Sequence, residues 1–320
     1  MAHGTTSLLA ISGADILRLV EPAAIVDALA EGFKALSDGK VQAPPRPQVT
    51  VPGKGISLAM LAWTQGQMIA LKTVNVFHGN HKLGLESHQA LVSLFDAETG
   101  APVAILDGAS LTGLRTAAAA ILSVRELARK DARTALVVGS GVQAREHIRQ
   151  LALARPFNEI RVFARNQDLA RELAGAVPNG KAVPDLEAAV RSSDVICLTT
   201  SADKPVIESD WVPDGCHVTS VGFAPPGSEV PPALIDRARL FVETIGAFSP
   251  APAGCAELAG RDPAQGAELG AVLLGRKPGR SSDAEVTLYK SMGNAMEDMV
   301  VANLAYQAAV AAGAGMQVKI

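Results

Sequence analysis

The sequence predicts an α/β protein in which a doubly wound parallel sheet is joined to a second domain of the α+β class. Two observations carry this prediction. An apolar run at 135–138 ends in the glycine-rich segment Gly139-Ser140-Gly141-Val142-Gln143-Ala144, and strand-like segments then alternate with helical ones as far as residue 222. The residues before 134 show instead a helical stretch followed by several strand-like runs.

The N-terminal third is expected to form the α+β domain. Helix signals run from Ser12 to about residue 37, where Ser37-Asp38-Gly39-Lys40 marks a stop. Strand-like runs follow at 47–51, 56–63, 67–77 and 89–96, separated by turn residues, and they resemble an antiparallel sheet. A further helix begins near Gly108 and carries Arg115 ahead of a run of small residues.

The glycine-rich segment has the Gly-x-Gly-x-x-Ala spacing of a dinucleotide site. Gly139 permits a tight turn, Gly141 lets the backbone approach a pyrophosphate, and Ala144 allows close packing of helix on strand. The helix that follows offers N–H groups to the phosphates. A helix at 145–156, a strand at 159–164 and further strands at 194–200 and 216–222 complete a Rossmann-type sheet, with Ser140, Val142 and Gln143 also in the turn.

The end of the second strand of this sheet distinguishes the two nicotinamide cofactors. An acidic residue there would bind the ribose 2′-hydroxyl and repel a 2′-phosphate, but the sequence has Arg165 and Asn166. Arginine pairs bidentately with phosphate, so we expect NADPH as cofactor, with NADH possible but weaker. The alternative is that Arg165 is simply a solvated residue at the strand end.

Composition excludes several classes of partner. The net charge is −3 over 320 residues, so we expect no nucleic acid and no anionic membrane as partner. The segment Met1 to Thr6 does not resemble a leader and no stretch is apolar enough to span a membrane, so we expect a cytoplasmic protein. The three cysteines and six histidines lack metal-binding spacing, and no metal is predicted.

Several separate motifs carry a resemblance to a known family. The chain resembles the ornithine cyclodeaminase/mu-crystallin family over nearly its whole length, and its ketimine reductase members (1-pyrroline-2-carboxylate reductases) most. The matching motifs are the Arg46 segment, Leu71-Lys72-Thr73-Val74-Asn75, Ser87-His88-Gln89-Ala90, Leu114-Arg115-Thr116-Ala117-Ala118, the glycine-rich segment, and Lys290-Ser291-Met292-Gly293 followed by Glu297-Asp298.

The resemblance implies the domains and the site residues. Residues 1–117 with 296–320 would form a substrate-binding and dimerisation domain of a homodimer, and 118–295 the NAD(P)-binding domain. Arg46, Lys72 and Arg115 would hold the α-carboxylate of a small imine substrate, a role that suits charge-assisted hydrogen bonds. Further cofactor contacts are expected from Thr116, Thr200, Ser201, Ser291, Met292 and Gly293, several of which could instead cap helices or strand ends.

A long alanine-rich helix is expected to open at 289–298 and to reach about residue 312, with its first amides facing cofactor or substrate. The role of His88, in an expected turn, is left open between a loop anchor and a proton relay. Residues 250–282 are read as a mobile loop or cover in which Glu257 is solvated.

Two departures from the cyclodeaminases of this family indicate the reaction. Those enzymes carry an Asp where this chain has Ala224, and a Glu where it has Leu58. Alanine cannot transfer protons. We therefore expect NADPH to reduce a cyclic ketimine, 1-pyrroline-2-carboxylate or 1-piperideine-2-carboxylate, at C2, giving proline or pipecolate. Lys72, the expected catalytic residue, or a water would serve the nitrogen.

Three alternatives to this reading are kept. The substrate could be an open-chain imino acid, as in an alanine dehydrogenase or an iminosuccinate reductase. The chain could be an ornithine cyclodeaminase. It could also bind NADPH and a small carboxylate without turnover, because a fold does not by itself fix a function.

Overall fold

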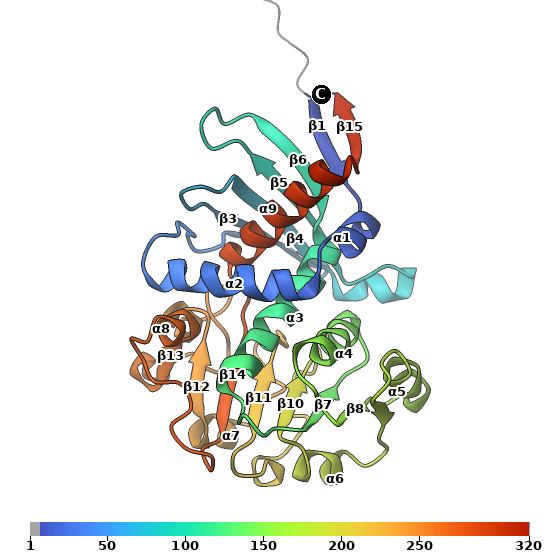
Figure 1. The fold of residues 1–320 in the computed structure, drawn as a ribbon, viewed down its shortest axis with the longest axis vertical. Coiled ribbons are helices and arrows are strands. Elements are labelled where there is room, and N and C mark those ends of the chain that lie inside the picture. The colour runs from blue at the N-terminus through green and yellow to red at the C-terminus, as the bar shows by residue number, and fades with distance from the viewer. Residues whose placement is uncertain (1–6, 320) are drawn as a thin grey trace, which may run out of the picture. The chain divides into compact units, whose positions relative to one another are not determined.

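The computed structural model describes residues 7–319 of the chain, which folds into two compact units (Figure 1). The first unit comprises Met1–Arg115 with Asn294–Ile320, and the second Thr116–Gly293. The boundaries expected after residues 117 and 295 differ from these by two residues each. The segment Met1 to Thr6, on which the expectation of no leader rests, lies outside the described residues.

The first unit is built on a seven-stranded mixed sheet in the order β15-β1-β6-β5-β4-β3-β2. Pairing is antiparallel except between β1 and β6. The strands are β1 (Ser7–Ile11), β2 (Gln48–Val51), β3 (Gly55–Ala62), β4 (Ile69–Val76), β5 (His88–Phe95), β6 (Pro102–Asp107) and β15 (Met316–Lys319). The helices are α1 (Gly13–Leu19), α2 (Pro22–Ser37), the 3-10 turn η1 (His78–Leu83) and α9 (Ala295–Ala312), and α3 (Gly108–Leu127) begins here.

One face of this sheet is buried and the other is open. The cross-strand row Met60, Lys72, Val92 and Leu106 is buried, and α9 packs against β3, β4 and β5. Because successive residues of a strand point to opposite faces, the neighbouring row Leu61, Leu71, Ser93 and Ile105 lies on the other face. On that face Leu61 is 42% exposed. The sequence of β3 is almost entirely apolar, but the strand is buried on one face only.

The second unit confirms the doubly wound parallel sheet. Its eight strands are all parallel in the order β13-β12-β14-β11-β10-β7-β8-β9. The strands are β7 (Thr134–Val138), β8 (Glu159–Phe163), β9 (Gly180–Ala182), β10 (Val195–Leu198), β11 (His217–Ser220), β12 (Arg239–Val242), β13 (Gly266–Glu268) and β14 (Thr287–Lys290). The connecting helices are α4 (Val142–Ala154), α5 (Gln167–Ala174), α6 (Leu186–Arg191), α7 (Pro232–Arg237) and α8 (Leu269–Leu273), with short 3-10 turns η2 (Ser209–Trp211), η3 (Ile245–Phe248) and η4 (Pro263–Gln265).

The order of this sheet reverses between β7 and β10. From β7 the chain moves outward to β8 and β9, then returns to β10 on the other side of β7 and continues to β11. Ligands of open α/β sheets bind at such a switch point, beyond the carboxyl ends of the strands. The glycine-rich segment directly follows β7 and therefore lies at the switch point.

Several expected elements differ from the observed ones. The helical stretch expected from Ser12 to about residue 37 forms two helices, because the chain is extended at Val20 and Glu21 and Pro22 starts α2. The last long helix begins at Ala295 and not at Tyr289, which belongs to β14. His88 begins β5 instead of lying in a turn.

Some ordered elements were not expected from the sequence. Strands β1, β6 and β15 were not expected, and the region 250–282 contains η4, β13 and α8 instead of a loop alone. Glu257, read as solvated, is 8% exposed in its side chain and pairs with Lys290. Strands β1 and β15 have only five and four residues, which leaves little periodicity in the sequence to detect.

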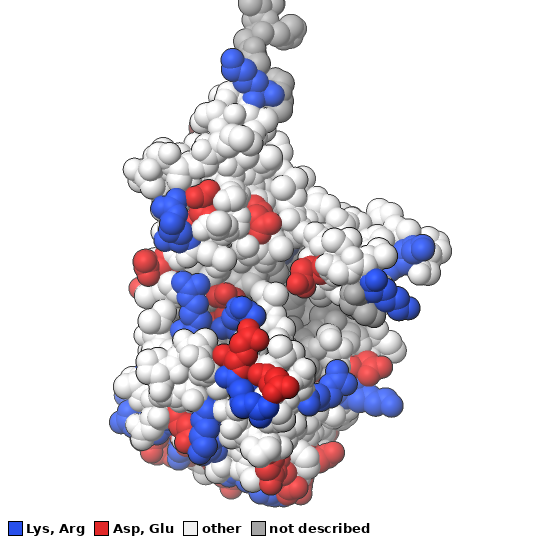
Figure 2. All heavy atoms as spheres, turned by 90° about the vertical axis from the view of Figure 1, so that its right-hand side faces the viewer, with Lys and Arg blue, Asp and Glu red and all other residues white. Residues whose placement is uncertain are grey.

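On the face drawn in Figure 2, basic and acidic side chains are interspersed. Within residues 7–319, none of the helices combines the length and apolar character that a membrane crossing needs. In the same residues, His, Cys, Asp and Glu side chains do not gather in threes as metal ligands would. The three cysteines are buried and not disulfide-bonded.

Candidate active site

The first unit buries a lysine against an aspartate. Lys72 lies in the middle of β4 on the buried face of the sheet, and Asp298 lies in the first turn of α9, which covers that face. The Lys72 Nζ is 2.8 Å from Oδ1 and 2.7 Å from Oδ2 of Asp298. Both side chains are almost fully buried. An ammonium removed from water in this way needs such a partner.

Arg115 joins the same cluster from α3. Its Nε donates to Asp298 Oδ1 at 3.0 Å, and its Nη1 donates to Glu297 Oε2 at 3.0 Å. Glu297 also accepts the backbone N–H of Asn294, whose side chain caps the first turn of α9. This reciprocal capping box fixes both the start of α9 and the carboxylate that orients Arg115. The guanidinium is therefore held rigidly in a buried site.

Arg46 lies half-buried in the extended segment that precedes β2. The Ala59 N–H donates to the Pro47 carbonyl at 3.2 Å, so the register of β2 and β3 continues beyond β2. Further toward the N-terminus, Gln42 forms an isolated bridge with Trp63. Arg46 lies between these two pairings, so the segment that carries it runs beside β3, the strand that pairs with β4 and Lys72.

The charges of the buried cluster balance before any substrate is added. Lys72 and Arg115 oppose Glu297 and Asp298. Burial is the main cause that lowers the pKa of Lys72, to about 8, while Asp298 acts in the opposite direction and Arg115 lowers it further. A lysine with this pKa can release and recover a proton near neutral pH.

In the second unit, the turn after β7 has the geometry that a dinucleotide requires. Gly139 has a φ of 139°, and a Cβ there would lie 2.4 Å from Thr199 Oγ1. Among the described residues nothing lies within 4 Å of a Cβ built on Gly141. Gly141 is the N-cap of α4 and offers no side-chain cap to the helix amides. These amides and the open space above Gly141 fit a pyrophosphate.

The residues of the turn and the strand end that follows are accessible. Ser140, Gly141 and Val142 are exposed and Gln143 is half-buried. Arg165 is exposed just beyond β8. Asn166 caps α5, since its Oδ1 accepts the N–H groups of Asp168 and Leu169. The amide nitrogen of Asn166 is the group that would donate to a phosphate.

Thr200 is held by a buried glutamate that the sequence analysis did not single out. The Glu229 Oε2 accepts both the N–H and the Oγ1 of Thr200, at 2.8 and 2.7 Å. Ser201 is exposed, and Thr116 is buried within α3. The roles of these three residues in binding a cofactor stay predictions.

The segment 291–293 is bonded to a second buried glutamate. The Ser291 hydroxyl and the N–H groups of Met292 and Gly293 all donate to Glu243 Oε1, at 2.7 to 2.9 Å. We expected these groups, and the amides of the last helix, to face cofactor or substrate. In this structure the Glu243 carboxylate takes them, and Asn294 N–H is taken by Glu297. The segment is fixed from within, and its contact with the cofactor is untested.

A family model confirms the resemblance, because the one for the ornithine cyclodeaminase/mu-crystallin family matches residues 9–313. The chain belongs to this family. Mouse ketimine reductase mu-crystallin is 32% identical over 285 residues, which cover 88% of this chain and 90% of the mouse protein.

Two solved structures of the ornithine cyclodeaminase/mu-crystallin fold are similar over almost the whole chain. Thermococcus litoralis Δ1-pyrroline-2-carboxylate reductase, in complex with NADH and L-proline, is 29% identical with a TM-score of 0.91 and covers 97% of this chain and 100% of its own. An archaeal alanine dehydrogenase dimer with bound NAD is 28% identical with a TM-score of 0.88, covering 98% and 100%. As a member of this family, the present chain is an NAD(P)-dependent oxidoreductase that acts on C=N or CH–NH groups.

The residues missed from sequence are the acidic partners of the site. Glu297 and Asp298 belong to one of the family motifs, but no role was assigned to them. The spacing of Asn294 and Glu297, which is that of a capping box, is a signal that could have placed Glu297 at the start of a helix. Glu229 and Glu243 carry no comparable signal, since each contacts residues brought close only by adjacent strands of the parallel sheet.

Proposed function

We propose that this protein reduces a cyclic ketimine carboxylate with NADPH, converting 1-pyrroline-2-carboxylate to L-proline, 1-piperideine-2-carboxylate to L-pipecolate, or both. The observation that carries the proposal is the buried cluster in which Lys72 and Arg115 are oriented by Asp298 and Glu297. The dinucleotide turn after β7 supports the cofactor, and the ketimine and pyrroline-2-carboxylate reductases among the relatives support the substrate class.

The charge balance of the cluster supports a substrate with one carboxylate. Lys72 and Arg115 are already neutralised, so an incoming carboxylate needs one more cation. The family resemblance assigns this role to Arg46, which lies in the extended segment before β2. With all three cations engaged, the α-carbon of the substrate is held by paired, charge-assisted hydrogen bonds.

We assign the proton of the reaction to Lys72. Reduction of C=N adds a hydride to C2, which the nicotinamide supplies, and leaves the nitrogen protonated. A group that holds its proton at neutral pH but releases it readily suits this task. The pKa of Lys72, about 8 in its buried site, has this property.

Two residues argue against cyclodeamination. Leu58 is buried in β3, and Ala224 lies in the segment after β11. At these positions cyclodeaminases of the family have acidic residues, which can take the proton of a substrate amine. Neither leucine nor alanine can do so. Reduction of a protonated imine needs no such base, because that imine is already electrophilic.

The preference for NADPH rests on Arg165 and Asn166. Both follow β8 where an acidic residue would select NADH, and Arg165 is exposed. The similar structures hold NADH or NAD, so the test must compare both cofactors.

The deciding experiment follows the oxidation of NADPH and NADH with each of the two ketimines, alongside an ammonia assay with ornithine. We expect rapid NADPH-dependent turnover of at least one ketimine and no ammonia from ornithine. Ammonia release from ornithine, with both ketimines inert, would refute the proposal and the argument from Ala224.

An open-chain imino acid is the second candidate, because the archaeal alanine dehydrogenase shares the fold at a TM-score of 0.88. The same cationic residues would hold its carboxylate. Dependence on ammonia discriminates between the candidates, since an open-chain imine is formed from a keto acid and ammonia whereas a cyclic ketimine is reduced without it. Pyruvate with and without ammonium is therefore included in the assay.

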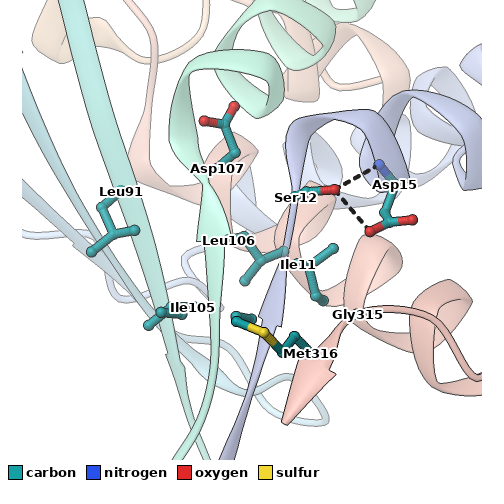
Figure 3. Close-up of a pocket in the computed structure, with 10 residues that line it drawn as sticks. Ile11, Ser12, Asp15, Leu91, Ile105, Leu106, Asp107, Gly315 and Met316 are labelled. Carbon is teal, nitrogen blue, oxygen red and sulfur yellow. Dashed lines mark hydrogen bonds between the residues drawn. The ribbon is translucent and has the colours of Figure 1, made fainter. Parts of the chain in front are cut away.

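We infer that the open face of the first sheet pairs with a second copy of the chain. The row Leu61, Leu71, Ser93 and Ile105 is apolar apart from one hydroxyl, and Leu91 on the same face is 48% exposed. Leu91, Ile105 and Met316 are among the residues that line an open pocket of about 330 Å³. Figure 3 shows these side chains on strands β5, β6 and β15. An apolar sheet face of this kind is typical of a subunit interface.

A further inference from the structure

Glu229 links two loops at the carboxyl edge of the parallel sheet. Its Oε2 accepts the N–H and hydroxyl of Thr200, which follows β10. Its Oε1 accepts the hydroxyl of Ser220, the last residue of β11, and the N–H of Gly222, both at 2.8 Å. Glu229 is only 2% exposed, so the four protein donors take the place of water around its carboxylate.

The loop after β10 in turn contacts the dinucleotide turn. The Thr199 N–H and hydroxyl both donate to the Val138 carbonyl, at 3.0 and 2.8 Å. A Cβ on Gly139 would lie 2.4 Å from Thr199 Oγ1. Thr199 and the turn that fits the pyrophosphate are therefore held by the bonds to Val138, whereas Thr200 is held by Glu229.

The loop after β11 is held from the other side by a lysine. Lys290, the last residue of β14, donates to the Gly222 carbonyl and lies 3.0 Å from Glu257. A Cβ on Gly222 would lie 2.7 Å from both Glu229 Cδ and the Thr200 carbonyl. Gly222 thus has both backbone polar groups bound to buried charged side chains, and it leads directly to Ala224.

We infer that Glu229 is a positioning residue that fixes the loops after β10 and β11 to receive the nicotinamide half of the cofactor. In a sheet of this order the adenosine half lies on the β7 and β8 side of the switch point and the nicotinamide half on the β10 and β11 side. Glu229 touches only the second side. This inference rests on the proposed function for its cofactor alone, not for its imine substrate.

The isosteric variant Glu229→Gln tests the inference. Each carboxylate oxygen accepts one backbone N–H, from Thr200 or from Gly222. A glutamine amide has one oxygen, so in either orientation its NH2 group faces a backbone donor. The side-chain volume is unchanged while the two loops cannot both keep their positions.

The measurement is calorimetric titration with NADPH and with 2′-phospho-ADP-ribose, which lacks the nicotinamide ring. For Glu229→Gln we expect NADPH to bind about tenfold or more weakly, and the fragment within about twofold of its wild-type affinity. The matched control is Glu208→Gln, an exposed glutamate of the same unit without a side-chain cap bond. It should leave both affinities unchanged.

Two outcomes would overturn the inference. One is unchanged affinity for NADPH in a folded Glu229→Gln protein, and the other is an equal loss for NADPH and the fragment, which would show a general loss of structure. If Glu229→Gln does not fold, Ser220→Ala removes one of the four donors and should shift NADPH affinity in the same direction by a smaller factor. Because binding needs no imine, failure of ketimine turnover would contradict the proposed function and leave this inference standing.

Discussion

The Nζ of Lys72 lies within 2.8 Å of both carboxylate oxygens of Asp298, and Asp298 also accepts from Arg115 Nε. One carboxylate therefore serves two cations that reach it from different elements, β4 and α3. Its position at the start of α9 depends on the capping box formed by Asn294 and Glu297.

Asp298→Asn should shift the pH dependence of reduction. Asp298 raises the pKa of Lys72 against the effect of burial, so its neutralisation lowers that pKa below about 8. If protonated Lys72 serves the imine nitrogen, kcat/KM should decline at a lower pH than in the wild type. Profiles between pH 6 and 10 measure this.

The same substitution leaves Lys72 and Arg115 buried beside a neutral side chain. Removing one partner of a buried ion pair costs about 3–5 kcal/mol of folding free energy. Asp168→Asn, at an exposed pair with Arg171, is the control and should change neither the profile nor the stability. An unchanged profile in a folded Asp298→Asn enzyme would rule out Lys72 as the proton donor.

The unfolding free energy should rise with pH on the alkaline side. Lys72 has a pKa of about 8 in the folded protein and 10.5 as its ordinary value, so the unfolded chain binds more protons between these values. Its contribution to stability is present above about 10.5 and is lost as the pH falls through about 8. Each unit of pKa is worth about 1.4 kcal/mol, which bounds the effect at about 3 kcal/mol.

Urea denaturation of the wild type and Lys72→Met between pH 7 and 10 tests this expectation. The unfolding free energy of the wild type should rise relative to that of Lys72→Met as the pH increases, because only the wild type gains from deprotonation of Lys72. Parallel curves would show that Lys72 does not titrate in this range.

The two glycines of the dinucleotide turn should separate stability from cofactor binding. Gly139→Ala places a Cβ 2.4 Å from Thr199 Oγ1 on a backbone with positive φ, so it should lower both the melting temperature and cofactor affinity. Gly141→Ala meets open space in the described residues and should fold nearly as well as the wild type. It should nevertheless bind NADPH at least about tenfold more weakly, because the methyl group occupies the space of the pyrophosphate.

Thermal melts and cofactor titrations on the two variants check this pair. Wild-type affinity in Gly141→Ala would show that the pyrophosphate does not lie above this turn.

Arg165→Ser should reduce the preference for NADPH. The guanidinium beyond β8 would pair with the 2′-phosphate, so its loss should weaken NADPH binding about tenfold and leave NADH binding nearly unchanged. The matched control is Arg171→Ser, because Arg171 is also exposed but lies within α5, away from the end of β8. An equal change in the affinities for NADPH and NADH would show that Arg165 is only a solvated residue at the strand end.

A charge on the open sheet face should dissociate the proposed dimer. Leu91→Asp adds a desolvated charge at the centre of that face, whereas Leu153→Asp places the same change on an exposed position of α4. Light scattering coupled to size-exclusion chromatography should report a dimer for the wild type and Leu153→Asp, and a monomer for Leu91→Asp. A monomeric wild-type protein would contradict the proposal directly.

The sequence by itself determined the parts of this protein that depend on local chain geometry. Gly139 and Gly141, the apolar run before them and the alternation of strands and helices determine a parallel sheet with a glycine-rich turn at its switch point. Lys72, Arg46 and Arg115 are expected as site residues because the family resemblance implies them, and their contact with a substrate stays a prediction.

Tertiary structure alone decided which carboxylates hold those cations and which groups they leave available. Asp298 and Glu297 are more than 180 positions from Arg115 in the chain and meet it only because α9 packs on the buried face of the sheet. Glu229 and Glu243 likewise bind loops that parallel pairing of β10, β11, β12 and β14 brings together. A buried charge acquires its partner through packing between distant segments, and no local pattern records that choice.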